Sequence, residues 1–174
     1  MSEEINLIIR EATAADATQL TNVMATISEQ TEYLALDELG MDLSLDLLQQ
    51  QLDLLYQSPT NVLLLALDDN EIVGTASISS RDEKRIAHIG EVGISILKEY
   101  WGFGLGSVLM EELIEWSKKT NIIRRLELSV QKQNKAAIHL YQKFGFHTEA
   151  VMKRGALSDQ GIFLDCLLMS LMID

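Results

Sequence analysis

Three glycines alternate in the stretch from Trp101 to Ser107, at positions 102, 104 and 106, and an apolar helical pattern begins directly after them. Glycine has no Cβ atom, so a bound group can lie against the backbone of such a turn. The first N–H groups of a helix have no partner within the helix, and the helix dipole is positive at that end. The stretch therefore predicts a site for an anionic group such as phosphate.

The sequence of this turn does not match two common phosphate-binding motifs. The P-loop requires Gly-Lys followed by Ser or Thr, whereas Gly106 is followed by Ser107 and Val108. The dinucleotide motif GxGxxG, started at Gly102, requires a glycine at position 107, and the surrounding elements are not a run of βαβ units. A tight turn without a ligand is the alternative interpretation, because short glycine motifs often occur by chance.

Apolar periodicity predicts the elements that position this turn. Between Leu105 and Asn121 apolar residues recur at helical spacing with acidic residues opposite, and Thr13 with Asp16 resembles a capping box. The predicted elements, in chain order, are a strand at 6–10, a helix at 13–28, a helix capped by Asp42 or Ser44 that ends near 58–59, hairpin strands at 61–67 and 72–79, a strand at 86–97 after a charged turn at 81–85, a helix at 105–121, a strand at 125–131, a helix at 134–144, and strands at 146–151 and 161–172 around a turn at 155–160.

This order of elements predicts a three-layer α/β fold. We expect a mixed central sheet of about six to seven strands flanked by about four helices. The chain of 174 residues shows no internal repeat and no low-complexity linker, so we expect one domain over residues 1–174.

Composition limits the partners and the compartment. The 14 basic and 26 acidic residues give a formal net charge of −12, which argues against nucleic-acid and anionic-membrane partners. The single cysteine, Cys166, lies in an apolar run, which favours a packed core thiol over a catalytic one and leaves no internal disulfide. No signal-peptide pattern and no apolar run of the roughly 20 residues needed to cross a bilayer is present. We therefore expect a soluble, cytoplasmic protein.

Two separated motifs give the chain a family resemblance. ISILKEYWGFGLGSVLMEELI, from Ile94 to Ile114, is similar to the strand, [Arg/Gln]-x-x-G-x-[Gly/Ala] turn and helix of the GNAT superfamily of acetyl-CoA-dependent N-acetyltransferases. NKAAIHLYQKFGF, from Asn134 to Phe146, is similar to the N-x-x-A-x-x-L-Y-x-x-x-G-F signature of that family. Both occur in the family's order, and the order of elements extends the likeness over nearly the whole chain.

The resemblance implies a cleft between two splayed parallel strands that end near Ile96 and Gln131, where the pantetheine arm of acetyl-CoA binds as an extra strand would. The cofactor-binding residues that it implies are Ile94, Ser95 and Ile96 on the strand, Gly102, Phe103, Gly104, Leu105, Gly106 and Ser107 in the turn, and Asn134 and Tyr141 on the later helix. The family usually has Arg or Gln where this chain has Trp101, so we expect pyrophosphate binding to rest on backbone N–H groups.

Acetyl transfer to an amine needs a neutral nucleophile, a polarised thioester and a proton for the departing thiolate. The resemblance implies that Tyr141 is the general acid; the alternative is a core aromatic on a helix. Glu91 is the candidate general base, because the strand period places it on one face with Ser95 and several branches of the superfamily have a carboxylate there. The alternative is a solvated strand carboxylate. Glu127 and Ser129 are reserve candidates for ordering a water or the amine.

Metal and covalent chemistry are not predicted. His88, His139 and His147 include no pair at the i, i+4 spacing of a zinc helix and accompany no cysteine cluster, so we interpret them as surface or packing histidines. The serine nucleophile motif GxSxG is absent, which favours direct transfer without an acyl-enzyme.

These features predict an N-acetyltransferase that moves acetyl from acetyl-CoA directly to a primary amine of a small molecule or peptide. The alternative is a catalytically inactive CoA-binding regulatory or structural module of the same fold. The acceptor is left open: the link 29–41, with Glu29, Glu32, Tyr33, Asp37 and Glu38, is either a substrate-facing wall or a solvated loop. The apolar last strand, FLDCLLMSLMI, leaves both a homodimer and a monomer open.

Overall fold

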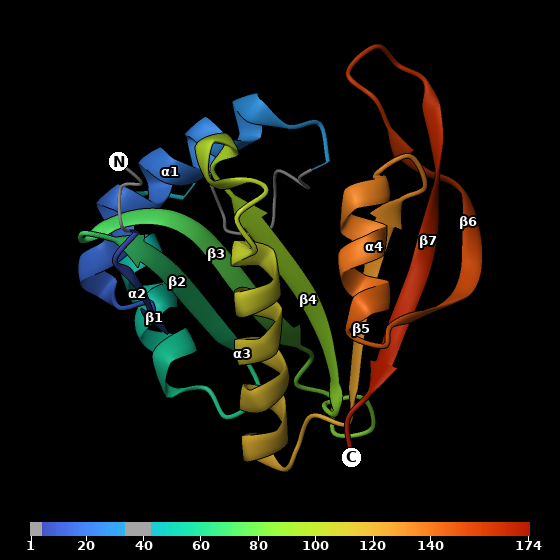
Figure 1. The fold of residues 1–174 in the computed structure, drawn as a ribbon. Helices are drawn as coiled ribbons and strands as arrows, with labels where there is room; N and C mark the ends of the chain where they lie inside the picture. The colour runs from blue at the N-terminus through green and yellow to red at the C-terminus, as the bar shows by residue number, and fades with distance from the viewer. Residues whose placement is uncertain (1–4, 34–42) are drawn as a thin grey trace.

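The fold is built on a seven-stranded mixed sheet with helices on both faces (Figure 1). The computed structural model describes residues 5–33 and 43–174. Its elements, in chain order, are β1 (Leu7–Glu11), the short η1 (Ala14–Asp16), α1 (Ala17–Gln30), α2 (Leu45–Gln57), β2 (Val62–Asp68), β3 (Glu71–Ser80), β4 (Ile89–Ile96), the short η2 (Lys98–Tyr100), α3 (Leu105–Thr120), β5 (Arg125–Gln131), α4 (Lys135–Lys143), β6 (His147–Leu157) and β7 (Phe163–Met172). The predicted α/β class and order of elements are confirmed.

Strand pairing opens the sheet at one place. The order across the sheet is β1-β2-β3-β4-β5-β7-β6, and every neighbouring pair is antiparallel except β4 with β5. These two parallel strands pair only from Ile89 with Arg125 to Glu91 with Glu127, and then separate. The predicted splayed pair is therefore confirmed, with its closed end at Glu91.

Two apolar clusters hold the layers together. On one face, Leu109 and Leu113 of α3 are fully buried in a cluster with Leu126 of β5, and α4 packs on the same side. On the other face, Leu20 of α1 and Leu52 of α2 form the second cluster with residues of β2 and β3. The sheet is thus the middle of three layers (Figure 1).

The pleat of β4 and β5 assigns each side chain to a layer. Val92, Leu126 and Leu128 belong to the cluster under α3 and α4, so even-numbered positions of these strands face those helices. Because side chains alternate along a strand, the odd-numbered Glu91 and Glu127 face the layer that contains α1 and α2.

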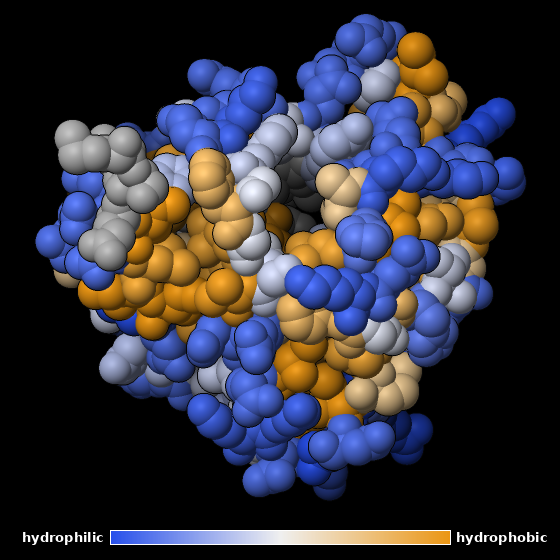
Figure 2. Space-filling model, in the orientation of Figure 1, coloured by the Kyte–Doolittle hydropathy of each residue, from blue (hydrophilic) through white to orange (hydrophobic). Residues whose placement is uncertain are grey.

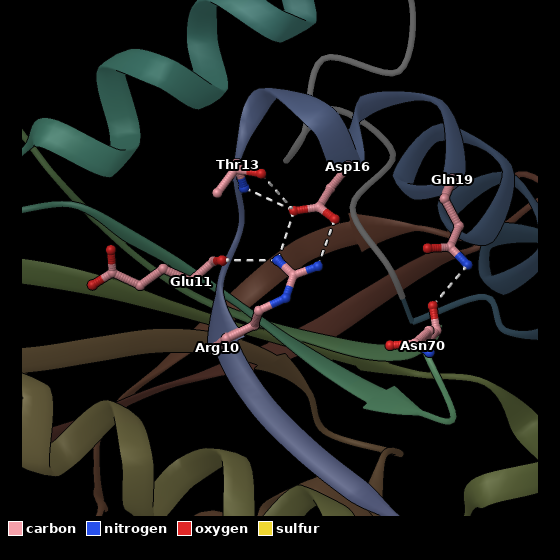
Figure 3. A network of polar contacts seen from close by, with 6 residues as sticks. All are labelled: Arg10, Glu11, Thr13, Asp16, Gln19 and Asn70. Carbon is pink, nitrogen blue, oxygen red and sulfur yellow. Dashed lines mark hydrogen bonds and ion pairs between the residues drawn. The ribbon is translucent and has the colours of Figure 1, made fainter.

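An ion pair fixes the start of the first helix (Figure 3). The two guanidinium nitrogens of Arg10 each donate to one carboxylate oxygen of Asp16 at 2.8 Å. The backbone N–H of Thr13 donates to the same carboxylate at 2.8 Å, and its hydroxyl at 3.2 Å. The predicted capping box is therefore present, in η1 just before α1. The bonds from Arg10, followed by those from Thr13, lower the pKa of Asp16 below its ordinary value.

We expect Asp16→Asn to lower the free energy of unfolding by about 1–3 kcal/mol at neutral pH, because the charge-assisted hydrogen bonds between the buried Asp16 carboxylate and the exposed Arg10 are broken. Since the pKa of Asp16 is lowered in the folded protein, its contribution is complete above the ordinary pKa of 3.8 and is lost as pH falls below it. Urea unfolding at several pH values measures this difference. Asp53→Asn, on the exposed side of α2, is the matched control and should change little. A wild-type advantage that persists undiminished in strong acid would contradict this role.

The predicted strand 86–97 begins too early. The charged turn continues through position 88, because the N–H of Ile86 donates to Glu83 O at 2.9 Å and that of Ile89 to Ile86 O at 3.0 Å. These turn bonds occupy donors that a strand would have directed to its neighbour. β4 therefore starts only at Ile89.

The predicted turn at 155–160 is also misplaced. β6 continues to Leu157, with a register shift between Met152 and Ala156, and the turn lies at 158–162. A Cβ atom at Gly155 would lie 2.8 Å from Cys166 Cβ, so this glycine permits β6 to pass closely over β7. The buried position expected for Cys166 is confirmed.

β7 lies inside the sheet between β5 and β6, so the apolar last strand is not an edge strand. The homodimer stays a prediction. None of the helices within residues 5–33 and 43–174 combines the length and apolarity required to cross a membrane.

Candidate active site

A cavity of about 440 Å³ opens where β4 and β5 separate. Figure 2 shows the hollow in the upper part of the molecule, between the N-terminal end of α3 and α4. Its lining residues are Ile27, Thr31 and Tyr33 near the end of α1, Ile94, Ser95 and Ile96 of β4, Tyr100, Trp101, Gly102, Gly104, Leu105, Gly106 and Ser107 around the turn, Ser129, Val130 and Gln131 of β5, and Asn134, Ala136, Ala137, Leu140 and Tyr141 near and on α4.

Most residues expected at the cofactor line this one cavity. They are Ile94, Ser95, Ile96, Gly102, Gly104, Leu105, Gly106, Ser107, Asn134 and Tyr141. Phe103 is the exception, because this residue is 70% exposed and does not line the cavity. Only the backbone of Phe103 remains a candidate contact.

The structure accounts for the glycines of the turn in two different ways. Gly102 and Gly104 both have φ of +81°, in the left-handed region, and an added Cβ atom would meet nothing within 4 Å. At Gly106 a Cβ atom would lie 3.1 Å from Leu140 Cδ2, so this glycine allows α3 to begin close to α4. Gly104 is the N-cap of α3 and no side chain caps the helix. The first N–H groups of α3 are therefore left for an anion.

Trp101 holds the glycine turn in place. Its indole Nε1 donates a 2.8 Å hydrogen bond to the carbonyl oxygen of Ile96, the last residue of β4. The side chain that stands where the family usually has Arg or Gln therefore binds the protein's own backbone and fastens the turn to the strand.

We expect Trp101→Phe to weaken acetyl-CoA binding by roughly 3- to 10-fold, because a neutral hydrogen bond that positions the turn is lost while a ring is kept. Calorimetric titration with acetyl-CoA measures the change. Trp116→Phe on α3, outside the cavity lining, is the matched control. Equal affinities of wild type and Trp101→Phe would show that the indole bond does not position the turn.

The described part of the cavity lining carries no charged side chain. Positive charge comes from its edge, where Lys143 Nζ at the end of α4 lies 3.0 Å from Ser107 Oγ. The N–H groups of the turn and Lys143 are therefore the groups at this cavity that would attract an anion.

Asn134 and Tyr141 are both positioned by their own motif. Asn134 Oδ1 accepts from the N–H of Ala137 at 3.3 Å and caps α4. The ring of Tyr141 lies 5.8 Å from that of buried Phe146, centroid to centroid, at an angle of 53°. The motif residues thus fix the helix start and support the phenol that lines the cavity.

The end of α1 is fastened to both sides of the opened strands. Gln30 Oε1 accepts from the N–H of Lys98, just after β4, at 2.8 Å. Gln131 Nε2, at the end of β5, donates to Glu32 O at 3.2 Å. These bonds place residues 30–33 across the mouth of the cleft.

Of the link residues considered as a substrate-facing wall, Tyr33 lines the cavity and Glu32 contributes its carbonyl to the bond from β5. Glu29 belongs to α1. Asp37 and Glu38 lie outside the described residues.

Glu91 lines a second, smaller hollow of about 200 Å³. The lining residues are Ser79, Arg81, Ile86, Ile89, Glu91 and Glu127. The larger cavity begins at Ser129, two residues beyond Glu127 on the same face of β5, which is about 7 Å along a strand. Glu91 therefore lies at the closed end of the splay, next to the cavity and not inside it.

Glu127 is part of an ion-pair network. Arg125 donates to both carboxylate oxygens of Glu149 at 2.7 Å and to Glu127 Oε2 at 2.9 Å. Ser170 Oγ donates to Glu149 at 2.6 Å. The bonds from Arg125, and then from Ser170, lower the pKa of Glu149 to about 2. Because Glu127 is bound by Arg125, Glu91 is the carboxylate of this hollow that is available to an amine.

No group of three or more His, Cys, Asp or Glu side chains with the arrangement of a metal site occurs in the part of the chain that the structure describes.

A family model described as the acetyltransferase (GNAT) family matches residues 27–146, from the end of α1 through the glycine turn to Phe146. The chain belongs to the GNAT acetyltransferase family. The resemblance found from the two motifs is confirmed. The GNAT chain is 33% identical over 107 residues to a protein from Escherichia coli (strain K12) named L-amino acid N-acetyltransferase AaaT. The aligned residues cover 62% of this chain and 65% of that protein. The match thus spans less than two thirds of that relative.

Solved structures agree with this family. A GNAT-family acetyltransferase from Streptococcus pneumoniae has a TM-score of 0.93 and 41% identity, covering 97% of this chain and 100% of that one. The structure of yncA from Salmonella typhimurium with its cofactor acetyl-CoA has a TM-score of 0.81 at 23% identity, covering 97% of this chain and 95% of that one. The second likeness shows the shared GNAT fold.

Sequence reasoning missed several lining residues of the GNAT cavity. Ile27 and Thr31 near the end of α1, and Ala137 and Leu140 on α4, line it without having been expected there. Ala137 and Leu140 could have been predicted, because Ala137, Leu140 and Tyr141 have the i, i+3, i+4 spacing of residues that share one helix face. The α1 pair gave no such signal, since α1 reaches the cleft only through tertiary packing.

Proposed function

We propose that this protein is an N-acetyltransferase that transfers the acetyl group of acetyl-CoA to a primary amine in a ternary complex. The observation that carries the proposal is the cavity between β4 and β5, which runs from the uncapped start of α3 to Ser129 and lies next to the hollow that contains Glu91. The names of the relatives support it, since each is called an N-acetyltransferase.

The cofactor would bind along this cavity. The N–H groups of the glycine turn and Lys143 would hold the pyrophosphate. Beyond Glu91, the cleft edge of β4 has no strand partner among the described residues, so the backbone of Ile94 to Ile96 is free to pair with the amide groups of the pantetheine arm. The acyl end would then lie toward the closed end of the splay.

The proposed base, Glu91, and the proposed acid, Tyr141, act on the reacting groups from opposite faces of the sheet. The amine nitrogen attacks the thioester carbonyl carbon from the side of Glu91, a C–N bond forms and the C–S bond breaks. Glu91 takes the proton that the amine loses, directly or through one water, and Tyr141 gives a proton to the departing thiolate. The products are an acetylated amine and CoA, with no acyl-enzyme.

Two readouts distinguish this enzyme from a CoA-binding module of the same fold. Saturating acetyl-CoA should raise the melting temperature, because a ligand that binds only the folded state stabilises it. Release of the CoA thiol should then depend on an added primary amine, and Tyr141→Phe should slow it. Stabilisation without turnover on any amine would support the module. Absence of both effects would contradict the proposed function.

A further inference from the structure

The small hollow beside the cleft is lined by two oppositely charged side chains that have no ion-pair partner among the described residues. Arg81 and Glu91 both line it, and neither makes an ion pair or a side-chain hydrogen bond within residues 5–33 and 43–174. The third charged residue of the hollow, Glu127, is bound by Arg125. Oppositely charged side chains at one hollow attract each other, yet these two remain apart and available to a ligand.

Strand register places Glu91 close to the end of β3, where Arg81 follows. Ser79 of β3 pairs with Glu91 of β4, so these two residues are direct neighbours across the strands. Arg81 follows Ser80, the last residue of β3, and is therefore at most about 7 Å from Ser79 along the chain. Ile86 and Ile89 form apolar sides of the same hollow. A small ligand with a positive and a negative group on neighbouring atoms fits between such charges.

We propose that this hollow binds the acceptor as a zwitterionic α-amino acid. Arg81 binds the carboxylate with its planar guanidinium, and Glu91 receives the amine that is acetylated. This inference rests on the proposed function and names its acceptor class. It distinguishes a free amino acid from a peptide N-terminus, because a peptide has no carboxylate beside its amine.

The surroundings leave room for the side chain of the amino acid. A neighbouring hollow of about 810 Å³ shares Ser79 with the small one. Leucines near and on α2 contribute to its wall, among them Leu43 and Leu54. L-Leucine is therefore a suitable probe, and L-leucinamide is its partner without the carboxylate.

Acetylation of these two amines by wild type, Arg81→Gln and Arg85→Gln tests the inference. Arg85 is exposed in the same turn and lines none of the hollows, so it is the matched control. We expect Arg81→Gln to lower kcat/KM for L-leucine by roughly 10- to 100-fold, mainly through KM, as for the loss of a hydrogen bond to a charged group. Activity on L-leucinamide should stay within about 2-fold. Arg85→Gln should leave both substrates unchanged.

Calorimetric titration of L-leucine into the CoA-saturated protein gives a second readout that needs no turnover. Wild type should bind L-leucine more tightly than Arg81→Gln does, by the same factor. Equal loss for L-leucine and L-leucinamide, no loss for L-leucine, or equal use of both amines by wild type would each overturn the inference. Binding of L-leucine that depends on Arg81 without any acetyl transfer would contradict the proposed function and keep the amino-acid site.

Discussion

Glu91→Gln should lower kcat for acetyl transfer by roughly 100- to 10,000-fold, the usual contribution of a general base. The amide keeps the shape of the side chain but cannot take the proton that the amine loses. Steady-state release of the CoA thiol with a primary amine measures this loss. Stabilisation by acetyl-CoA should be unchanged, because Glu91 lies outside the cofactor cavity.

Glu127→Gln is the matched control for this prediction. Glu127 pairs with Glu91 across the two strands and shares its hollow, but its carboxylate is bound by Arg125. We expect its amide variant to retain most of the activity. A Glu91→Gln variant with wild-type kcat, or a larger loss in Glu127→Gln, would transfer the role of base to another group.

Gly104→Val should weaken acetyl-CoA binding by roughly 100-fold or more, because several charge-assisted hydrogen bonds from the turn are lost together. Gly104 has φ of +81° at the N-cap of α3, and a β-branched residue is strained in that conformation. The backbone would move to relieve the strain and carry the N–H groups away from the phosphate. Calorimetric titration with acetyl-CoA measures the dissociation constant.

Gly161→Val separates this effect from general strain. Gly161 has φ of +77° and open space around an added Cβ atom, as Gly104 has, but it lies in the turn between β6 and β7. Both variants should lose a similar free energy of unfolding, of order 1–3 kcal/mol. Only Gly104→Val should lose affinity for acetyl-CoA. Equal affinities of the two variants would contradict the anion site at the turn.

Local signals explain why much of the fold was predictable. Helix caps at Ser44 and Asn134 and the stop after Thr120 depend on residues within a few positions of each other. The strand Arg125–Gln131 was predicted with its exact bounds, because its alternation of apolar and polar residues is undisturbed. Such features follow from backbone geometry and periodicity alone.

The errors come from contacts between distant segments. Gly155 suggested a turn, but it is a glycine because β6 passes over Cys166. Gly106 lines the cavity as expected, but its close approach to Leu140 of α4 could not be seen from the sequence. A single sequence shows that a side chain is absent and does not show what approaches it.

The two sides of the candidate site also differ in how far the sequence predicts them. The cofactor side was predictable because its turn and the motif around Tyr141 are contiguous in sequence. The acceptor side was not, because Arg81 lies in a charged turn and resembles any solvated residue there. Its place beside Glu91 follows only from the register of β3 and β4.

A crystal structure of the protein with acetyl-CoA tests the central claim most directly. We predict the pyrophosphate against the N–H groups of Gly102 to Ser107, the pantetheine arm between β4 and β5, and the acetyl group at the closed end of the splay beside Glu91. Acetyl-CoA bound outside this cavity, or bound in it with the acetyl group turned away from Glu91, would contradict the account.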